Sequence, residues 1–150
     1  MEIFEKPAFC VLGREGSTDD GAGFVQRLWQ EANTHFGEIA DRVLREENGA
    51  PAGFWGAMTD FPRSFAQWAD GFTHGLYLAG AEVPAGTDAP EGWTLWTVPG
   101  FRYVRFPGNM PFADALAAFA AEGFTLAGAV QEFTDPKTGE SFQCFPAERL

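Results

Sequence analysis

Hydrophobic residues follow two different periods in the first part of the chain. Residues 3–14 form an apolar run that ends at glycines, which predicts a strand. The segment after it places apolar residues in steps of three and four, the period of one buried helix face: Val25, Trp29, Ala32, Phe36, Ile39 and Val43. We expect one long helix here, with N-cap candidates at residues 17–20, an end near Asn48-Gly49 and an unfavourable interior residue at Gly37.

Further apolar runs predict two more strands and then a second strand and helix. Residues 54–59 and 74–83 are rich in apolar residues and are bounded by turn-forming residues, which is typical of strands. Residues 93–106 predict a strand that is bent or bulged at Pro99-Gly100. A short helix is expected after it, with Asn109 as its N-cap.

The last part of the chain completes a repeated order of elements. Residues 126–134 and 141–146 predict two strands joined by a turn. The order strand-helix-strand-strand therefore occurs twice, although the two copies share no clear sequence identity. We expect an α+β fold made of duplicated modules in one domain over 1–150, with pseudo-repeats of about 1–84 and 91–150.

Composition narrows the class of partner. The 150 residues contain 10 Lys and Arg against 21 Asp and Glu, which gives a formal net charge of −11, and 45% of the residues are hydrophobic. This length fits one domain with its own core, and this apolar content argues against disorder. The acidity disfavours nucleic acid and anionic membrane surfaces, because both bind clusters of Lys and Arg. With 15% aromatic residues, the chain fits a cationic or apolar partner better.

The lack of a recognisable targeting signal and the setting of the two cysteines favour a cytoplasmic protein. The first residues lack the basic start and apolar stretch of a signal peptide, and no unbroken apolar run approaches the ~20 residues of a membrane span. Cys10 and Cys144 lie in apolar runs and are expected to be buried thiols. We expect a cytoplasmic protein with no direct contact to nucleic acid or membrane. A homodimer and a protein partner stay open.

Motifs for cofactor and metal chemistry are missing from the sequence. No strand leads into a phosphate-binding Gly-x-x-x-x-Gly-Lys-Ser/Thr loop. His35 and His74 are isolated, and neither cysteine has a partner at metal-ligand spacing. No local signature of a catalytic nucleophile is present either. We therefore expect no metal and no cofactor.

Two carboxylates lie on otherwise apolar predicted strands. Glu82 follows Tyr77 to Ala81, and Glu132 follows a run of small apolar residues. A carboxylate on an apolar strand face is unfavourable unless it is paired, hydrogen-bonded or open to a cavity. The alternative is that each points to solvent or marks the end of its strand.

Aromatic residues on the predicted strands are the second group of candidates. They are Trp55, Tyr77, Trp93, Trp96, Tyr103 and Phe145. Core packing explains each of them, but Trp and Tyr also carry polar atoms that need partners, which suggests a cavity wall as well. Aromatic rings around a buried carboxylate would bind an apolar cation, since each cation–π contact contributes ~0.5–2 kcal/mol.

Short motifs along the whole chain form a recognisable series. They are Lys6-Pro7-Ala8-Phe9-x-Val11-x-Gly13, the Trp29 helix, Trp55-Gly56-x-Met58, Tyr77-Leu78-Ala79-Gly80-x-Glu82-Val83, Pro90-Glu91-Gly92-Trp93, Val98-Pro99-Gly100-x-x-Tyr103, and Glu132-Phe133-x-Asp135 to Phe145-Pro146. In their order and spacing these motifs resemble the GyrI-like (gyrase-inhibitor-like) small-molecule-binding family, which includes effector-binding domains of AraC-type and MerR-type regulators. The resemblance implies a curved antiparallel sheet with two helices on one side and a ligand cleft between the halves.

The resemblance also implies a role for one glutamate. In the family a glutamate on the penultimate strand pairs with cationic, lipophilic drugs in an aromatic pocket, and Glu132 occupies the matching place. The family's tyrosine shortly after that glutamate is absent here, where Phe133 follows directly. We predict as ligand-binding residues Glu132, Glu82, Trp55, Tyr77, Trp96, Tyr103 and Phe145.

Three functions remain open on the sequence. The first is a stand-alone cytoplasmic protein that binds amphipathic, cationic small molecules. The second is a hydrolase of cyclopropane-containing alkylating natural products, as some members of the family are, with Glu132 as the catalytic residue that activates water. The third is an acidic interaction module that acts on gyrase or a similar protein. We favour binding over catalysis.

Overall fold

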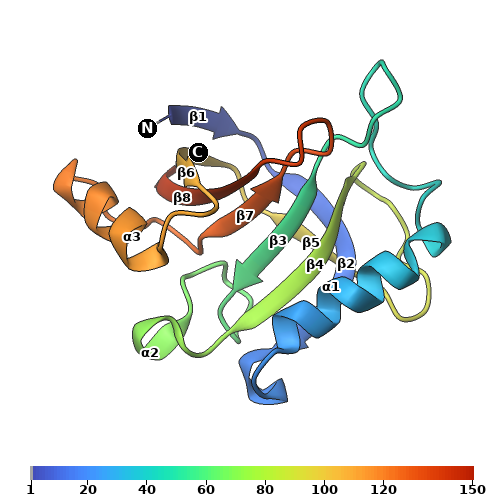
Figure 1. The fold of residues 1–150 in the computed structure, drawn as a ribbon, viewed down its shortest axis with the longest axis horizontal. Helices are drawn as coiled ribbons and strands as arrows, with labels where there is room; N and C mark the ends of the chain where they lie inside the picture. Colours follow the sequence, from blue (N-terminus) through green and yellow to red (C-terminus); the bar gives the residue numbers. More distant parts are fainter. Residues whose placement is uncertain (1) are drawn as a thin grey trace.

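The computed structural model describes residues 2–150 and contains one eight-stranded sheet in which all neighbouring strands are antiparallel (Figure 1). The strand order is β1-β6-β8-β7-β3-β4-β2-β5. The strands are β1 (Glu2–Lys6), β2 (Phe9–Ser17), β3 (Phe54–Thr59), β4 (Leu76–Val83), β5 (Thr94–Val98), β6 (Phe101–Pro107), β7 (Gln131–Thr134) and β8 (Ser141–Arg149). The helices are α1 (Phe24–Thr34), α2 (Ala69–Phe72) and α3 (Phe112–Ala121).

The strand order is the same on both sides of the central β3–β7 pair. On one side β2, α1, β3 and β4 follow each other in the chain and their strands pair as β2-β4-β3. On the other side β6, α3, β7 and β8 do the same, with the pairing β6-β8-β7. The predicted order strand-helix-strand-strand is therefore confirmed for both halves, while a duplication over 1–84 and 91–150 stays a prediction.

Both long helices pack on one face of the sheet. Leu28 and Ala32 of α1 belong to a buried cluster with Leu12 of β2 and Ala79 of β4. Ala115 and Phe119 of α3 belong to another, with residues of β6 and β8. Since α1 covers one half of the sheet and α3 the other, the middle strands β3 and β7 are left without a helix over them (Figure 1).

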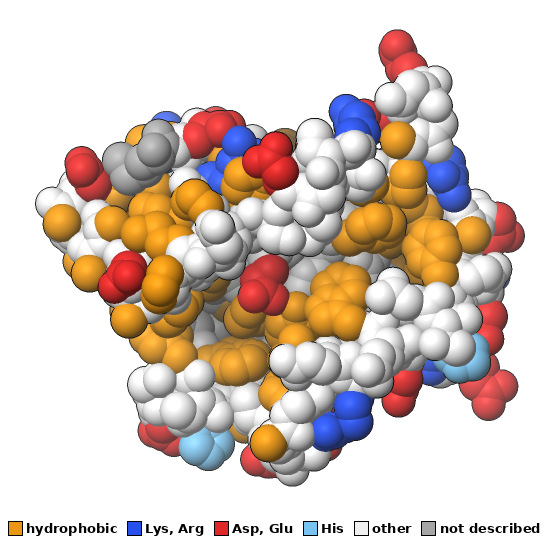
Figure 2. Space-filling view, viewed as in Figure 1, with side chains coloured by type: hydrophobic (Ala, Val, Ile, Leu, Met, Phe, Trp, Pro, Cys, Tyr) orange, Lys and Arg blue, Asp and Glu red, His pale blue; other side chains and the backbone are white. Residues whose placement is uncertain are grey.

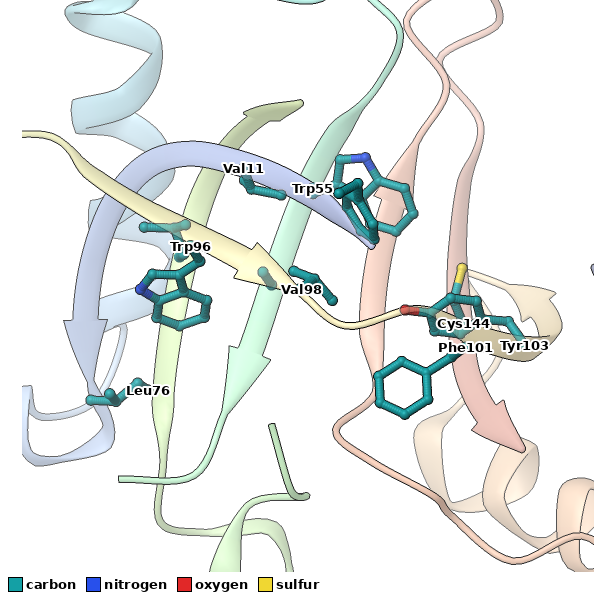
Figure 3. Close-up of a cluster of buried hydrophobic side chains, with 11 residues drawn as sticks. Val11, Trp55, Leu76, Trp96, Val98, Phe101, Tyr103 and Cys144 are labelled. Atoms are coloured by element: carbon teal, nitrogen blue, oxygen red, sulfur yellow. The ribbon is translucent and has the colours of Figure 1, made fainter. Parts of the chain in front are cut away.

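The opposite face of the sheet has a core of its own, shown in Figure 3. Trp96 of β5 and Tyr103 of β6 belong to this same cluster, although β5 and β6 lie near opposite ends of the sheet order. The sheet must therefore curve around the cluster, as predicted. Gly80 pairs with a second glycine on β2 at one bend, where a Cβ on Gly80 would lie 2.1 Å from a backbone oxygen.

The first helix is shorter than predicted. α1 ends at Thr34, well before Asn48-Gly49, and a short 3₁₀ turn, η2 (Phe36–Glu38), follows it at the interior glycine. Ile39 and Val43 are still buried, so the helical spacing marked burial beyond the helix itself. The caps at 17–20 belong to a separate 3₁₀ turn, η1 (Thr18–Asp20), where Ser17 and the third residue of the turn form a reciprocal capping box.

Three of the expected strands also differ. The run 3–14 is not one strand but β1 and β2, which separate at Pro7 and pair with different halves of the sheet. The run 93–106 is not one bent strand but β5 and β6, which pair with different halves of the sheet. They separate at Pro99-Gly100, where the proline has no N–H for a strand ladder. The run 126–134 is a strand only from Gln131, because this side chain bonds the backbone N–H and C=O of Met58 in place of the strand backbone.

Three smaller features concern a helix cap, the cysteines and the length of the helices. Asn109 is not the N-cap of α3; Pro111 occupies that position and makes no side-chain cap. Cys10 and Cys144 are free and buried, as expected. Among the helices of residues 2–150, none combines the length and apolar character that a membrane crossing requires.

Candidate ligand-binding cleft

A cleft of about 630 Å³ lies on the helical face of the sheet, over β3 and β7 and between α1 and α3. Its described lining residues are Trp29, Gly56, Met58, Gln67, Trp68, Phe72, Tyr77, Gly108, Met110, Phe112, Ala129, Val130, Glu132, Phe133, Thr134, Ser141, Phe142 and Gln143. Figure 2 shows this face hollowed, with hydrophobic side chains around an acidic one. The gap between the two helices is therefore a real cavity and is not filled by side chains.

Glu132 is the only charged residue among the described residues that line the cleft. These lining residues include no Lys, Arg or His. Seven of these lining residues are aromatic and two are methionines. The rings of Phe133 and Phe142 pack with Trp55 on the far face of the sheet, so five aromatic rings face the cleft. The cleft therefore combines a negative charge with a largely apolar, polarisable wall.

A chain of two hydrogen bonds fixes the geometry around this carboxylate. The hydroxyl of Tyr77 donates to Oε1 of Glu132 over 2.5 Å. The indole N–H of Trp29 donates to the same hydroxyl over 3.0 Å. The three residues come from β4, β7 and α1, so elements of both halves meet at one point of the cleft. Among the hydrogen bonds of the described residues, Oε2 of Glu132 receives none, so this oxygen can meet a ligand.

The environment changes the ionisation of both groups. Glu132 is open to the space of the cleft, but the protein around its carboxylate replaces part of the surrounding water. This desolvation raises the pKa of Glu132 above its ordinary value, and the hydrogen bond from Tyr77 partly opposes the rise. The pKa of the buried Tyr77 is raised as well, first by burial and then by the nearby carboxylate. Tyr77 therefore stays a hydrogen-bond donor at neutral pH.

A glycine makes room for this pair. Gly56 of β3 lies directly opposite Glu132 in the β3–β7 register. A Cβ at this position would lie 1.9 Å from the hydroxyl oxygen of Tyr77 and 2.7 Å from Oε1 of Glu132. Such distances are far inside normal contact, so any side chain here would separate the two groups.

The ends of the cleft are held by loops. Phe72 of α2 packs its ring edge-on against Phe112 of α3, with the ring centroids 5.1 Å apart. Trp68 is fixed by an indole N–H bond of 3.0 Å to the carbonyl of Leu76. On the other side the amide of Gln143 donates to the carbonyl of Pro107, at the end of β6, over 3.1 Å, and to that of Met110, in the loop before α3, over 2.8 Å. These contacts connect the cleft walls to the sheet.

The structure brings together only Tyr77 and Glu132 of the seven predicted ligand residues. Trp55 and Glu82 lie on the opposite face of the sheet, where they line a second pocket of about 410 Å³. There the Trp55 indole N–H donates to Glu82 over 3.2 Å, and the ammonium group of Lys6 pairs with the same carboxylate at 3.2 Å. Glu82 and Glu132 therefore do not share a cavity.

The remaining three predicted residues are buried in the cores. Trp96 is in the cluster on the far face of the sheet, and its indole N–H donates to Glu15 over 2.7 Å. Tyr103 is fully buried in the same cluster, and Phe145 packs against α3. They lie outside the cleft lining as described. Whether any of the seven residues contacts a ligand stays a prediction.

Several cleft residues were missed at the sequence level. Trp29 and Phe36 fit core packing equally well by their helical spacing, but Trp29 is only half-buried and lines the cleft. Trp68 and Phe72 lie at the start and end of the four-residue helix α2, which is too short for a periodicity that predicts the direction of a side chain. The direction of Met58 could have been predicted, because Met58 lies three residues after Trp55 on the same strand. Residues an odd number apart on a strand face opposite sides of the sheet. Across residues 2–150, no three His, Cys, Asp or Glu side chains form a group that could hold a metal.

No protein-family model matches the chain, and no curated protein matches its sequence. Solved structures do match its fold. The chain is similar to SAV2435 bound to tetraphenylphosphonium, with a TM-score of 0.59, 14% identity, and coverage of 98% of this chain and 93% of that one. It is also similar to a putative bacterial transcription regulation protein from Staphylococcus aureus MU50, with a TM-score of 0.60, 15% identity, and coverage of 98% and 97%.

A protein solved in complex with DNA, EcmrR, is similar over part of its length. The match to EcmrR in its complex with DNA has a TM-score of 0.60 and 11% identity, and it covers 99% of this chain but 57% of that one. At such low identities these likenesses establish the fold. The chain has the GyrI-like fold that its motifs indicated.

Proposed function

We propose that the chain binds amphipathic organic cations in the cleft, with the carboxylate of Glu132 as their counter-ion. The observation that carries this proposal is the charge of the cleft: a single carboxylate, no cationic side chain, and five aromatic rings on the same side of the sheet among the described lining residues. An anion would meet repulsion there, and a neutral ligand would leave the carboxylate without a partner.

Physical chemistry favours a cation that is also apolar. Each ring face adds ~0.5–2 kcal/mol to the binding of a cation. An apolar ligand also displaces water from the cleft, which strengthens its attraction to the carboxylate. The volume of about 630 Å³ lies within the roughly 300–1,000 Å³ typical of small-molecule sites. The likeness in fold to SAV2435, whose structure contains tetraphenylphosphonium, supports the same class of ligand.

Tetraphenylphosphonium is the probe that tests this proposal. Its binding to the purified chain can be followed by isothermal titration calorimetry, with Glu132→Gln as the test variant. We expect Glu132→Gln to weaken binding by about tenfold or more, which corresponds to ~1.4 kcal/mol. Triphenylphosphine oxide, which carries no net charge, is expected to bind Glu132→Gln at least as tightly as the wild-type chain, because its oxygen accepts hydrogen bonds and a glutamine amide can donate one.

Glu82→Gln is the matched control, because it removes the same charge on the far face of the sheet. If net charge alone attracted the cation, both variants would weaken binding to the same small extent. Equal affinities of the wild-type chain and Glu132→Gln for tetraphenylphosphonium would overturn the proposal.

Hydrolysis of a strained cyclopropane is the second candidate, and the raised pKa of Glu132 favours it. A carboxylate with a raised pKa is a stronger base toward water. In this reaction Glu132 takes a proton from water, the water oxygen bonds to a ring carbon, and a ring carbon–carbon bond breaks. The released electron pair moves into the conjugated part of the substrate, which is then protonated. Phe133 follows the glutamate in place of the family's nearby tyrosine and carries no hydroxyl. In this chain the hydroxyl of Tyr77 donates a hydrogen bond to the Glu132 carboxylate instead.

Mass spectrometry after incubation with a cyclopropane-bearing alkylating compound tests this candidate. An enzyme gives a product heavier by one water at a rate that falls in Glu132→Gln. A rate equal in the wild-type chain, in Glu132→Gln and without protein would exclude hydrolysis and leave binding untouched.

A further inference from the structure

A third cavity lies under α1, the helix that also borders the cleft. This side pocket has a volume of about 260 Å³ and lies between the second half of α1 and strands β3 and β4. Its walls include Ala32, Phe36, Phe54 and Trp93. Trp29 lines both cavities.

The two cavities follow each other along one face of the sheet. On β3, Gly56 lines the cleft and Phe54, two residues earlier, lines the side pocket. On β4, Tyr77 lines the cleft and Ala81 lines the side pocket. Residues an even number apart on a strand face the same side. The cavities therefore share a floor, and the indole of Trp29 stands between them.

The side pocket differs from the cleft in charge. None of its described lining residues is charged, and its walls are mostly alkyl groups and aromatic rings. The cleft next to it carries the Glu132 carboxylate. Side by side, the two cavities match a molecule with a cationic head and an apolar arm.

We propose that Trp29 is the partition that sets ligand specificity, and that the ligands are cations with one extended apolar arm that passes Trp29 into the side pocket. This inference rests on the proposed function, because the head of the ligand is held at Glu132. Trp29 is suited to this task, since a single hydrogen bond to Tyr77 holds its indole N–H and its ring is only half-buried.

Two phosphonium probes that differ only in their arm test the inference. Methyltriphenylphosphonium has no arm, and octyltriphenylphosphonium carries one of eight carbons. Because each buried methylene contributes favourably, we expect the wild-type chain to bind the octyl probe at least about tenfold tighter than the methyl probe. The ratio of the two affinities, measured by calorimetry, is the readout, so a general loss of binding does not affect it.

Ala32→Met fills the side pocket, and Ala120→Met is its control on an exposed part of α3. We expect the ratio to fall below about threefold in Ala32→Met, with the methyl probe unaffected, and to stay at the wild-type value in Ala120→Met. If Ala32→Met does not fold, Asn33→Trp covers the same pocket from an exposed position on its rim. Trp29→Ala removes the partition, and we expect its ratio to exceed that of the wild-type chain.

The outcomes separate this inference from the proposed function. If the ratio is unchanged in Ala32→Met, Asn33→Trp and Trp29→Ala while both probes still depend on Glu132, the partition is wrong and the cation site stands. If neither probe depends on Glu132, the proposed function fails, and this inference fails with it.

Discussion

The hydroxyl of Tyr77 donates a hydrogen bond of 2.5 Å to Oε1 of Glu132, and this contact joins the two halves of the sheet inside the cleft. Tyr77 comes from β4 in the first half and Glu132 from β7 in the second. The hydroxyl compensates in part for the desolvation of the carboxylate, because a hydrogen bond to the charged form favours ionisation. Tyr77 therefore controls the pH range in which the cleft carries its charge.

Tyr77→Phe tests this control. Without the hydroxyl, we expect the pKa of Glu132 to rise further above its ordinary value, since only desolvation remains. A cation needs the ionised carboxylate, so its affinity is full above the pKa of Glu132 and is lost as the pH falls through it. The pH at which half of the tetraphenylphosphonium affinity is lost should therefore be higher in Tyr77→Phe. Titrations over a series of pH values measure it.

Tyr103→Phe is the control for this experiment, because it removes a buried tyrosine hydroxyl from the far face of the sheet. Its pH profile should coincide with that of the wild-type chain. A profile of Tyr77→Phe that is not displaced, or is displaced to lower pH, would show that the hydrogen bond does not favour the ionised carboxylate.

Glu132→Gln is expected to change stability with a particular pH dependence. The folded-state pKa of Glu132 lies above its unfolded value, so ionised Glu132 destabilises the fold. This penalty is absent below the unfolded pKa, grows as the pH rises to the folded pKa, and is complete above it. At neutral pH the variant should be more stable by roughly a few tenths of a kcal/mol, because water in the cleft screens the charge.

Urea denaturation at several pH values measures this difference. The advantage of Glu132→Gln should shrink as the pH falls toward the unfolded pKa of a glutamate. A variant that is less stable than the wild-type chain at neutral pH would mean that the charge of Glu132 is better compensated than its surroundings indicate.

Gly56→Ala should separate Tyr77 from Glu132. The added Cβ would lie 1.9 Å from the Tyr77 hydroxyl oxygen, so one side chain has to move. Overpacking of this kind costs about 1–3 kcal/mol of stability, and we expect the tetraphenylphosphonium affinity to fall as well. Gly37→Ala is the control, because a Cβ there meets nothing within 4 Å. Thermal melts and calorimetry on both variants check the prediction, and equal behaviour of the two would contradict it.

Order and type of the main elements could be predicted from the sequence because they depend on local spacing. The helical period of the apolar residues predicted α1, and apolar runs bounded by turn-forming residues predicted most of the strands. The boundaries depended on contacts between distant segments. Gln131 begins β7 because its side chain bonds Met58, which no local pattern shows. Likewise, the separation of β5 from β6 at Pro99 is visible locally, but their different partners are not.

The sequence indicated the charged residue of the candidate site but few of the residues that form its walls. Glu132 stood out as a carboxylate on an apolar strand, and the family resemblance pointed to the same residue. The aromatic walls could not be assigned, because a ring on a strand fits either face of a sheet that has a core on both sides. Trp55, for example, packs into the core on the far face, whereas Tyr77 lines the cleft. Direction depended on strand register, which only the pairing of distant strands determines.

The hydroxyl of Tyr103 gives a final prediction, in which removal of a polar group stabilises the fold. Tyr103 is fully buried, and its hydroxyl has no hydrogen-bond partner among the described residues. In the unfolded chain the same hydroxyl bonds to water, so folding leaves a polar group unsatisfied. We expect Tyr103→Phe to raise the free energy of unfolding by about 1 kcal/mol, as measured by urea denaturation at neutral pH. Tyr77→Phe, which loses two hydrogen bonds, should lower the free energy of unfolding by a similar amount.

The gain expected for Tyr103→Phe should not depend on pH between neutrality and the ordinary tyrosine pKa. Burial raises the pKa of Tyr103 and so keeps its hydroxyl neutral over this range. A loss of stability in Tyr103→Phe would mean that the hydroxyl has a partner after all, such as a buried water.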